Sequence, residues 1–251
     1  MNKIIINRFP PLGYACNEAV NTLCTNLSFA GENIRKIMLT SCHAAEGKTF
    51  LSMNIIRSLT KLGKTVALVD ADLRRSIISS KYNLKFENEE KKWGLSHLLA
   101  GMAGEDDVIY ETNLPGALLV PVGREVLDSL ALLMSPRFET LLNHLREKVD
   151  YVIVDAPPVG MLIDAVQIAR SCDGMLLVVN YNEVRRRELI EAKQQLEQTN
   201  CPILGTVLNQ VEFDNYLNRK YYYKSYYSHY DHYGTDSKQY SRQKQKKAAK
   251  K

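Results

Sequence analysis

Residues 37–49, Ile-Met-Leu-Thr-Ser-Cys-His-Ala-Ala-Glu-Gly-Lys-Thr, decide the fold. The apolar run at 37–39 is typical of a buried strand, and apolar residues recur at helical spacing after Gly47-Lys48-Thr49. A strand, a small-residue loop, Gly-Lys-Thr and a helix form the layout of a phosphate-binding loop, because backbone N–H groups and the helix dipole favour anions there. In such a loop we expect Lys48 to reach the β- and γ-phosphates and the Thr49 hydroxyl to bind Mg²⁺.

This loop departs from the usual motif at two places. Cys42 stands where the first Gly of the motif is usual, and Ala44-Ala45 stand where Gly would ease the turn. On this stretch alone, a helix start that happens to carry Gly-Lys-Thr is an alternative to a nucleotide site.

Length and composition favour one globular domain with an appendage. The chain has 251 residues, of which 45% are hydrophobic, and its mean hydropathy is −0.26. No apolar run approaches the roughly 20 residues that a membrane helix needs, and the N-terminus has too short an apolar stretch for a secretory signal. The five cysteines are scattered, so we interpret them as reduced packing residues of a cytoplasmic protein.

Charge is distributed unevenly along the chain. Residues 216–251 contain ten Lys or Arg and two Asp or Glu, a net charge of +8, which leaves 23 basic and 26 acidic residues in 1–215. A mildly acidic body therefore carries a basic tail, which is typical of an interaction segment.

Apolar runs alternate with helical patterns along the body. Strands are predicted at 37–39, 65–69, 117–121, 151–154, 175–179 and 203–208, and helices at 17–30, 51–62, 95–99, 127–147 and 189–196. Such alternation predicts an α/β fold, a doubly wound and mostly parallel sheet with helices on both faces. We expect an extended N-terminal arm at 1–14, a P-loop domain at 15–212 and a disordered Tyr-rich tail at 213–251.

Three aspartates follow directly after apolar strands: Asp70 and Asp72 after 66–69, and Asp155 after 151–154. An ionised carboxylate is costly to bury unless it is paired or bound to a metal, and strand ends meet at the edge of the sheet where ligands bind. Helix capping explains one of the three well but not all. We therefore expect Asp72 and Asp155 to hold Mg²⁺ and Asp70 to orient or deprotonate an acceptor hydroxyl, although spacing alone allows Asp70 and Asp72 to exchange roles.

Tyrosine is concentrated in the tail, where nine of the fourteen tyrosines lie in the last 36 residues. Aromatic residues interleaved with Lys and Arg can stack on nucleic-acid bases. Beside a phosphate loop they can instead accept phosphate, and each phosphotyrosine adds about −1.5 to −2 charges to the basic tail. The expected acceptors are Tyr221, Tyr222, Tyr223, Tyr226, Tyr227, Tyr230 and Tyr233.

Four stretches together resemble the bacterial tyrosine kinases of capsule and exopolysaccharide synthesis. They are Gly47-Lys48-Thr49, residues 66–75, residues 150–158 and the terminal tyrosine cluster. Residues 66–75 are similar to the Walker A′ motif of that family and residues 150–158 to its Walker B motif. The last predicted strand is also similar, which implies that Asn209 lies near the adenine. We expect ATP to contact Ala45, Glu46, Gly47, Lys48, Thr49, Phe50 and Asn209.

The resemblance implies partners and a reaction. The chain would be the cytoplasmic kinase half, recruited to the inner face of the membrane by a separate activator protein of the polysaccharide co-polymerase type. Copies would associate and phosphorylate each other's tails, and a cognate tyrosine phosphatase would reset them; no nucleic acid is expected. In the family, Glu-x-x-Arg-x-x-Arg packs between subunits, but here Glu18 is followed by Asn21 and Cys24.

The expected function is thus ATP- and Mg²⁺-dependent phosphorylation of protein tyrosines. Two alternatives come from other classes of protein. One is a partitioning-type P-loop ATPase, although such proteins usually carry an extra Lys early in the loop, where His43 stands here. The other is a non-catalytic nucleotide-binding regulator, which the departures at Asn21, Cys24 and Ala44-Ala45 support.

Overall fold

The computed structural model describes residues 2–89, 91–160 and 163–211. Within them the strands are β1 (Asn2–Ile6), β2 (Lys36–Ser41), β3 (Val66–Asp70), β4 (Leu84–Phe86), β5 (Tyr110–Thr112), β6 (Ala117–Val120), β7 (Tyr151–Asp155), β8 (Gly174–Asn180) and β9 (Ile203–Asn209). The helices are α1 (Tyr14–Ser28), α2 (Lys48–Lys61), α3 (Ile78–Lys81), α4 (Leu95–Leu99), α5 (Glu105–Val108), α6 (Ser129–Leu133), α7 (Pro136–Lys148), α8 (Asp164–Ala169) and α9 (Arg186–Glu197).

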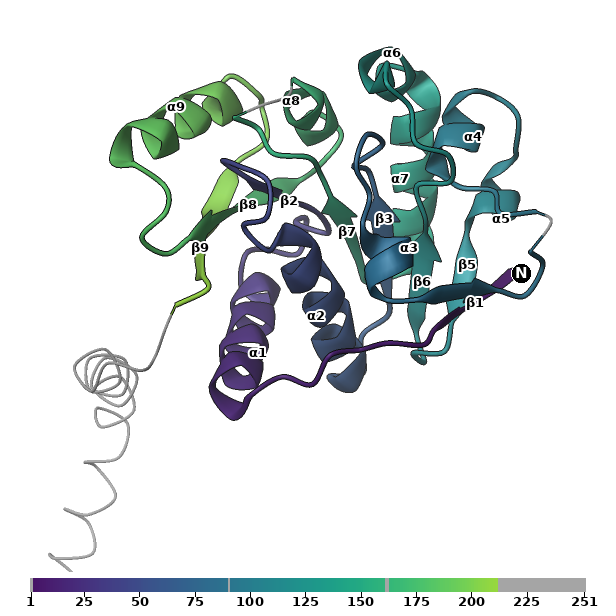
Figure 1. The fold of residues 1–251 in the computed structure, drawn as a ribbon, viewed down its shortest axis with the longest axis horizontal. Helices are drawn as coiled ribbons and strands as arrows, with labels where there is room; N and C mark the ends of the chain where they lie inside the picture. The colour runs from purple at the N-terminus through teal and green to yellow at the C-terminus, as the bar shows by residue number, and fades with distance from the viewer. Residues whose placement is uncertain (1, 90, 161–162, 212–251) are drawn as a thin grey trace, which may run out of the picture. The chain divides into compact units, whose positions relative to one another are not determined.

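All nine strands form one sheet in the order β4-β1-β5-β6-β3-β7-β2-β8-β9. The neighbours from β6 through β3, β7, β2 and β8 to β9 are parallel, whereas β4 pairs with β1 and β5 with β6 in antiparallel fashion. Helices α1 and α2 cover one face of the sheet, and α7, α8 and α9 cover the other (Figure 1). The doubly wound α/β fold predicted from the sequence is confirmed.

The central strands are buried on both faces. Every residue of β2, β3 and β8 is buried, which explains why they have continuous apolar runs rather than alternating patterns. Because these strands are parallel, β2, β3 and β7 all end at the same edge of the sheet. That edge carries the phosphate-loop sequence and the aspartates.

The N-terminal residues do not form the free extended arm that we expected. Residues 2–6 form strand β1, which lies between β4 and β5. Ile4 and Ile6 are buried in the core while Ile5 between them is 45% exposed. This alternation is the signal of a half-buried strand, so the sheet begins well before residue 15.

Three other expectations need correction. The single helix predicted at 127–147 is two helices, because Ser135 caps α7 and Pro136 occupies its first position. Residues 76–92, where no strand was predicted, contain strand β4 besides the short helix α3. Elements β5, α5 and α8 were not predicted. The tail expected at 213–251 lies outside the described residues.

We predict that Ile4→Ala lowers the free energy of unfolding by about 2–5 kcal/mol, the usual cost of removing a fully buried aliphatic side chain. The matched control is Ile5→Ala on the exposed side of β1, which should cost less than about 1 kcal/mol. Urea unfolding measures both values. Equal effects of the two variants would show that β1 is not packed against the core.

Candidate functional site

The phosphate loop joins the end of β2 to the start of α2. Gly47 precedes α2 with a φ of 88°, and a Cβ at this position would lie 2.0 Å from the side-chain nitrogen of Asn209. Only glycine therefore fits here. No side chain caps the first turn of this 14-residue helix, so its backbone N–H groups and the positive end of its dipole are open to a phosphate.

Side chains from the loop and from β9 fix the shape of the loop. The Glu46 carboxylate accepts hydrogen bonds from the backbone N–H groups of Cys42 (2.8 Å) and His43 (3.2 Å), and its other oxygen is buried without a partner among the described residues. Asn209 donates to the Glu46 carbonyl at 2.8 Å, and Gln210 donates to the Ala45 carbonyl at 3.0 Å. The loop is thus held from the end of β9, a link that the local sequence did not reveal.

Asp155 lies at the foot of the loop, fully buried at the end of β7. Ser52, one turn into α2, donates a hydrogen bond to its carboxylate at 3.2 Å. Burial raises the pKa of Asp155, while the nearby Lys48 ammonium and the Thr49 hydroxyl oppose that rise. The structure therefore brings Lys48, Thr49 and Asp155 together, as the sequence predicted.

Asp70 lies beside Asp155, because these two residues are paired in register between β3 and β7. Its side chain is fully buried; Ser76 donates a hydrogen bond to one oxygen, and the other oxygen has no partner among the described residues. Burial and, next, the negative charge of Asp155 raise the pKa of Asp70 well above its ordinary value. The free, buried oxygen is a group that can accept a proton.

Asp72 is half-buried in the turn after β3, where it accepts a hydrogen bond from the Arg75 backbone at 3.1 Å. In residues 2–89, 91–160 and 163–211, no three His, Cys, Asp or Glu side chains converge closely enough to hold a metal ion by themselves. A Mg²⁺ ion at this edge would thus also need phosphate oxygens, a hydroxyl group or water as ligands. The oxygen donors present are the kind that Mg²⁺ prefers.

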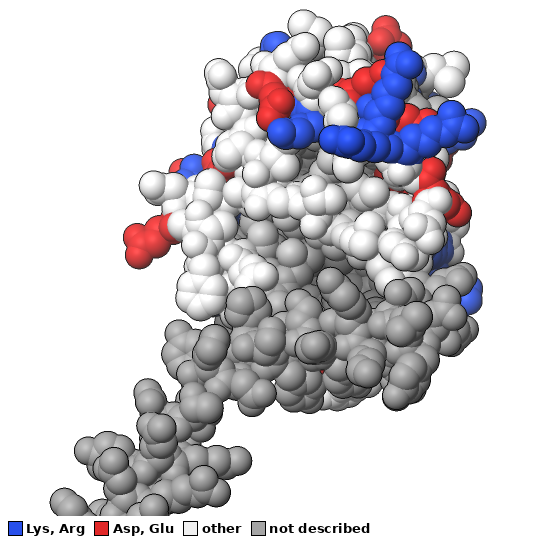
Figure 2. Space-filling view, turned by 90° about the vertical axis from the view of Figure 1, so that its left-hand side faces the viewer, with Lys and Arg blue, Asp and Glu red and all other residues white. Residues whose placement is uncertain are grey.

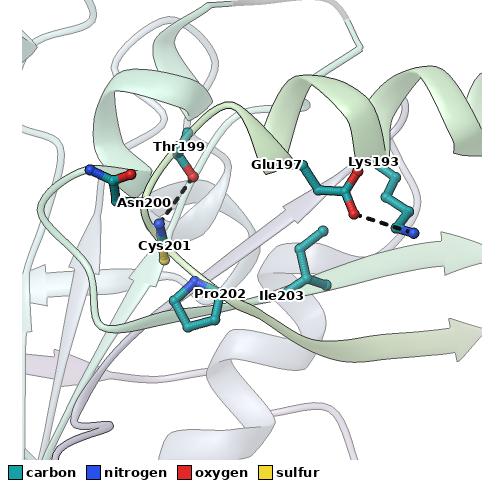
Figure 3. A pocket seen from close by; sticks show the side chains of 7 residues that line it. All are labelled: Lys193, Glu197, Thr199, Asn200, Cys201, Pro202 and Ile203. Atoms are coloured by element: carbon teal, nitrogen blue, oxygen red, sulfur yellow. Dashed lines mark hydrogen bonds and ion pairs between the residues drawn. The ribbon is translucent and has the colours of Figure 1, made fainter.

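A cavity of about 440 Å³ lies elsewhere, between the end of α9 and the start of β9. Figure 3 shows its lining, Lys193, Glu197, Thr199, Asn200, Cys201, Pro202 and Ile203. Asn209 at the opposite end of β9 contacts the phosphate loop. The cavity therefore belongs to the other edge of the sheet and is not the phosphate site.

Comparison with known proteins identifies the family. The family model described as an AAA domain matches residues 34–200. The tyrosine-protein kinase CpsD of Streptococcus pneumoniae is 38% identical over 195 residues, which cover 78% of this chain and 84% of that protein. The chain belongs to the bacterial tyrosine-protein kinases.

Solved structures agree with this assignment. The kinase domain of the Escherichia coli tyrosine kinase ETK is 31% identical and superposes with a TM-score of 0.74, covering 80% of this chain and 77% of that one. The septum site-determining protein MinD of Pyrococcus horikoshii, complexed with Mg-ADP, is 24% identical with a TM-score of 0.58, covers 70% of each chain, and shares the fold alone. The kinase thus has a nucleotide-binding P-loop fold.

Other candidate residues of the kinase have local partners. His43, which stands early in the phosphate loop, lies 3.4 Å from the Glu188 carboxylate. Arg74, which follows Asp72 by two residues, bonds Asp164, while its neighbour Arg75 is exposed. The Phe50 ring lies 5.9 Å from the Lys81 ammonium. The acceptor tyrosines expected between Tyr221 and Tyr233 lie outside the described residues.

The run Arg185-Arg186-Arg187 opens α9 as an exposed charged surface. Arg187 pairs with Glu191 at 2.8 Å, and Lys193 pairs with Glu197 at 3.3 Å. Figure 2, which looks onto the side that carries α9 and β9, shows basic and acidic side chains interspersed in its upper part. The arginine run is therefore a solvated helix face.

Ala45 occupies the left-handed region with a φ of 65°, a conformation that costs a residue with a Cβ atom about 1 kcal/mol or more. We predict that Ala45→Gly stabilises the kinase by about 1 kcal/mol and tightens ADP binding. The control is the exposed neighbour Ala44, whose φ is negative, so that Ala44→Gly should not stabilise. Thermal unfolding and ADP titration measure both effects, and a gain from Ala44→Gly alone would contradict the prediction.

Asp70→Asn should stabilise the nucleotide-free kinase at pH 8. Since the folded-state pKa of Asp70 is raised, the folded state binds more protons than the unfolded state between the two pKa values, and the free energy of unfolding falls as pH rises through that window. The Asn variant has no carboxyl group to titrate, so it does not lose stability in this window. The difference in the free energy of unfolding between the variant and wild type should therefore decrease as pH is lowered through the folded-state pKa. Asp72→Asn is the half-buried control. Unfolding curves in EDTA at several pH values test this, and an advantage that is constant with pH would refute it.

Proposed function

We propose that this kinase transfers the γ-phosphoryl group of ATP to tyrosine hydroxyls, chiefly those in the C-terminal cluster of another copy of the chain. The observation that carries the proposal is the arrangement at the edge of the sheet where β2, β3 and β7 end, which we call the catalytic edge. Lys48 and Thr49 open α2 beside the buried Asp155, and Asp70 is its neighbour in register with an unpartnered oxygen. A cation, a hydroxyl group and two carboxylates thus meet below an open helix N-terminus.

In the proposed reaction, the bond between Pγ and its bridging oxygen to Pβ breaks, and a bond from Pγ to the tyrosine oxygen forms, which leaves ADP. Phosphoryl transfer depends mainly on positioning and on neutralising charge. Backbone N–H groups at the start of α2 and the Lys48 ammonium hold the β- and γ-phosphates. Asp70 accepts the proton of the tyrosine hydroxyl, and its raised pKa makes it a stronger base than an ordinary aspartate.

Thr49, Asp72 and Asp155 are the residues that we propose to hold Mg²⁺ with the nucleotide, directly or through water. When bound, the ion would supply positive charge that offsets the negative charge of the phosphates. The interaction of Thr49 with the Asp155 carboxylate supports this set, because it places a hydroxyl oxygen and a carboxylate oxygen together at the head of α2.

We propose that the reaction regulates capsule or exopolysaccharide synthesis and export, together with a membrane activator of the co-polymerase type and a cognate tyrosine phosphatase. Membership of the kinase family and the net charge of +8 on residues 216–251 support this setting, since phosphorylation would remove that charge stepwise. Among the described residues no helix is both long and apolar enough to cross a bilayer. Recruitment to the inner face of the membrane by the activator is part of the proposal.

Contact between copies of the chain would lack the two arginines that the family pattern supplies at positions 21 and 24. Cys24 is 1% exposed and packs against α2 of its own chain. Asn21 accepts a hydrogen bond from Ser58 of α2 at 2.6 Å and donates one to Glu18 at 3.4 Å. These two positions, where the family has arginines, are therefore occupied by contacts within one chain.

Lys48→Met should abolish phosphotyrosine formation, because it removes the ammonium group at the first position of α2, beside Asp155. The matched control is Lys61→Met, which removes an exposed lysine at the other end of the same helix and should keep activity within about two-fold. The full chain is incubated with Mg²⁺, γ-labelled ATP and a membrane activator fragment, and both phosphotyrosine and free phosphate are measured.

The same assay separates the alternatives. Free phosphate without phosphotyrosine would indicate an ATPase of the partitioning type. Bound nucleotide with neither product would indicate a regulator. Unchanged labelling of the Lys48→Met variant would show that the phosphotyrosine came from a contaminating kinase.

A further inference from the structure

Arg74 is an arginine at the catalytic edge that the proposed mechanism leaves without a role. It follows Asp72 by two residues, and its side chain is 32% exposed. Its Nε donates a hydrogen bond to Oδ2 of Asp164 at 2.8 Å. Neither terminal nitrogen of the guanidinium group donates a hydrogen bond within residues 2–89, 91–160 and 163–211. The guanidinium group is therefore held through Nε, while its terminal nitrogens remain available as donors, with the negative charges of Asp128 and Asp72 in its surroundings.

The burial of Asp164 favours an ion pair with Arg74. Its side chain is only 1% exposed, and Oδ2 also accepts a hydrogen bond from the hydroxyl of Ser129, the first residue of α6. Oδ1 is buried without a partner among the described residues. A carboxylate this deeply buried needs a neutralising cation, and Arg74 is the one that contacts it. The pair Asp164–Ser129 thus joins α8 and α6 into a support for the guanidinium group.

The order of the strands places Arg74 on one side of the phosphate loop. The loop follows β2, Asn209 ends β9 two strands away on one side, and Arg74 follows β3 two strands away on the other. Asp155 and Asp70 lie between the loop and Arg74. A nucleotide whose base lies on the β9 side would direct its terminal phosphate toward the aspartates and Arg74.

We propose that Arg74 donates hydrogen bonds to the oxygens of the transferring phosphoryl group from the acceptor side, and that Asp164 is the positioning residue that aims it. The proposal rests on the proposed kinase reaction and names a specificity-determining contact within it. A planar guanidinium group suits this task, because its two terminal nitrogens can donate in parallel to two phosphoryl oxygens. Since Nε is already bound to Asp164, little side-chain entropy is lost when those donors engage.

The alternative is a purely structural ion pair, in which Arg74 only neutralises Asp164. Arg74→Lys distinguishes the two roles, because lysine keeps a positive charge for Asp164 but lacks the planar fork. Arg75→Ala is the matched control, since Arg75 is the exposed neighbour of Arg74. Asp164→Asn keeps an acceptor oxygen and the side-chain volume but removes the charge that holds Arg74.

The experiment measures the kcat of phosphotyrosine formation by the full chain with saturating Mg·ATP, the Kd of fluorescent ADP and the thermal midpoint of each variant. Arg74→Ala should lower kcat by about 100-fold, the usual effect of losing a donor that acts on transition-state charge, and should change the Kd of ADP by less than about 3-fold. Arg74→Lys should stay at least about ten-fold below wild type with an unchanged thermal midpoint. Arg75→Ala should stay within about two-fold of wild type.

A double-mutant cycle tests the positioning role. Asp164→Asn alone should lower kcat by about ten-fold, but it should have no further effect when Arg74 is already alanine. Full activity of Arg74→Lys, or of Arg74→Ala with only a lowered thermal midpoint, would overturn the role of Arg74. Additive losses would overturn the positioning role of Asp164. In contrast, phosphotyrosine formation by Lys48→Met would refute the kinase mechanism itself.

Discussion

Two carboxylates buried side by side constrain the whole catalytic edge. Asp70 and Asp155 are paired in register at the ends of β3 and β7, and each is about 1% exposed. Burial raises the pKa of both carboxyl groups, and the charge of Asp155 raises that of Asp70 further, while the Lys48 ammonium and hydroxyl donors oppose the rise at Asp155. The site is therefore short of positive charge. The Mg²⁺ ion that we propose would correct that deficit when it binds with the nucleotide, so that ligand binding and catalytic readiness would be coupled electrostatically.

Much of the fold could be predicted because the central strands are buried on both faces. The runs that became β2, β3, β7 and β8 are apolar without interruption, and each of them ends close to where the sequence predicted. The peripheral elements were harder. Strands β4 and β5 have three residues each, too few to show the alternation of apolar and polar residues that predicts a strand. The alternation in β1 and the Ser135-Pro136 start of α7 are signals present in the sequence. However, β1 has only five residues, and the apolar spacing beyond residue 136 favoured one continuous helix.

The candidate site was predictable where neighbours in sequence or strand ends meet. Lys48, Thr49 and Asp155 come together because a loop and a parallel strand end fix them. Contacts between distant segments could not be found in this way. Asn209 lies 163 residues from the carbonyl it holds, and Arg74 lies 90 residues from Asp164. Asp164 and Ser129 are polar residues at the start of two short helices, a pattern that indicates helix capping. The contacts of Asp164 with Arg74 and with Ser129 are visible only in the folded structure.

The attachment of β9 to the phosphate loop has a consequence for shortening the chain. The side-chain amides of Asn209 and Gln210 donate hydrogen bonds to two successive carbonyl groups of the phosphate loop. Both residues immediately precede the segment that carries the tyrosines. A truncation placed before Asn209 would remove these amides along with the acceptors. Such a shortened chain could lose nucleotide affinity because the phosphate loop has lost two hydrogen bonds, not because the tyrosines are missing. A variant without acceptor hydroxyls is therefore better made by Tyr→Phe substitutions in the full chain.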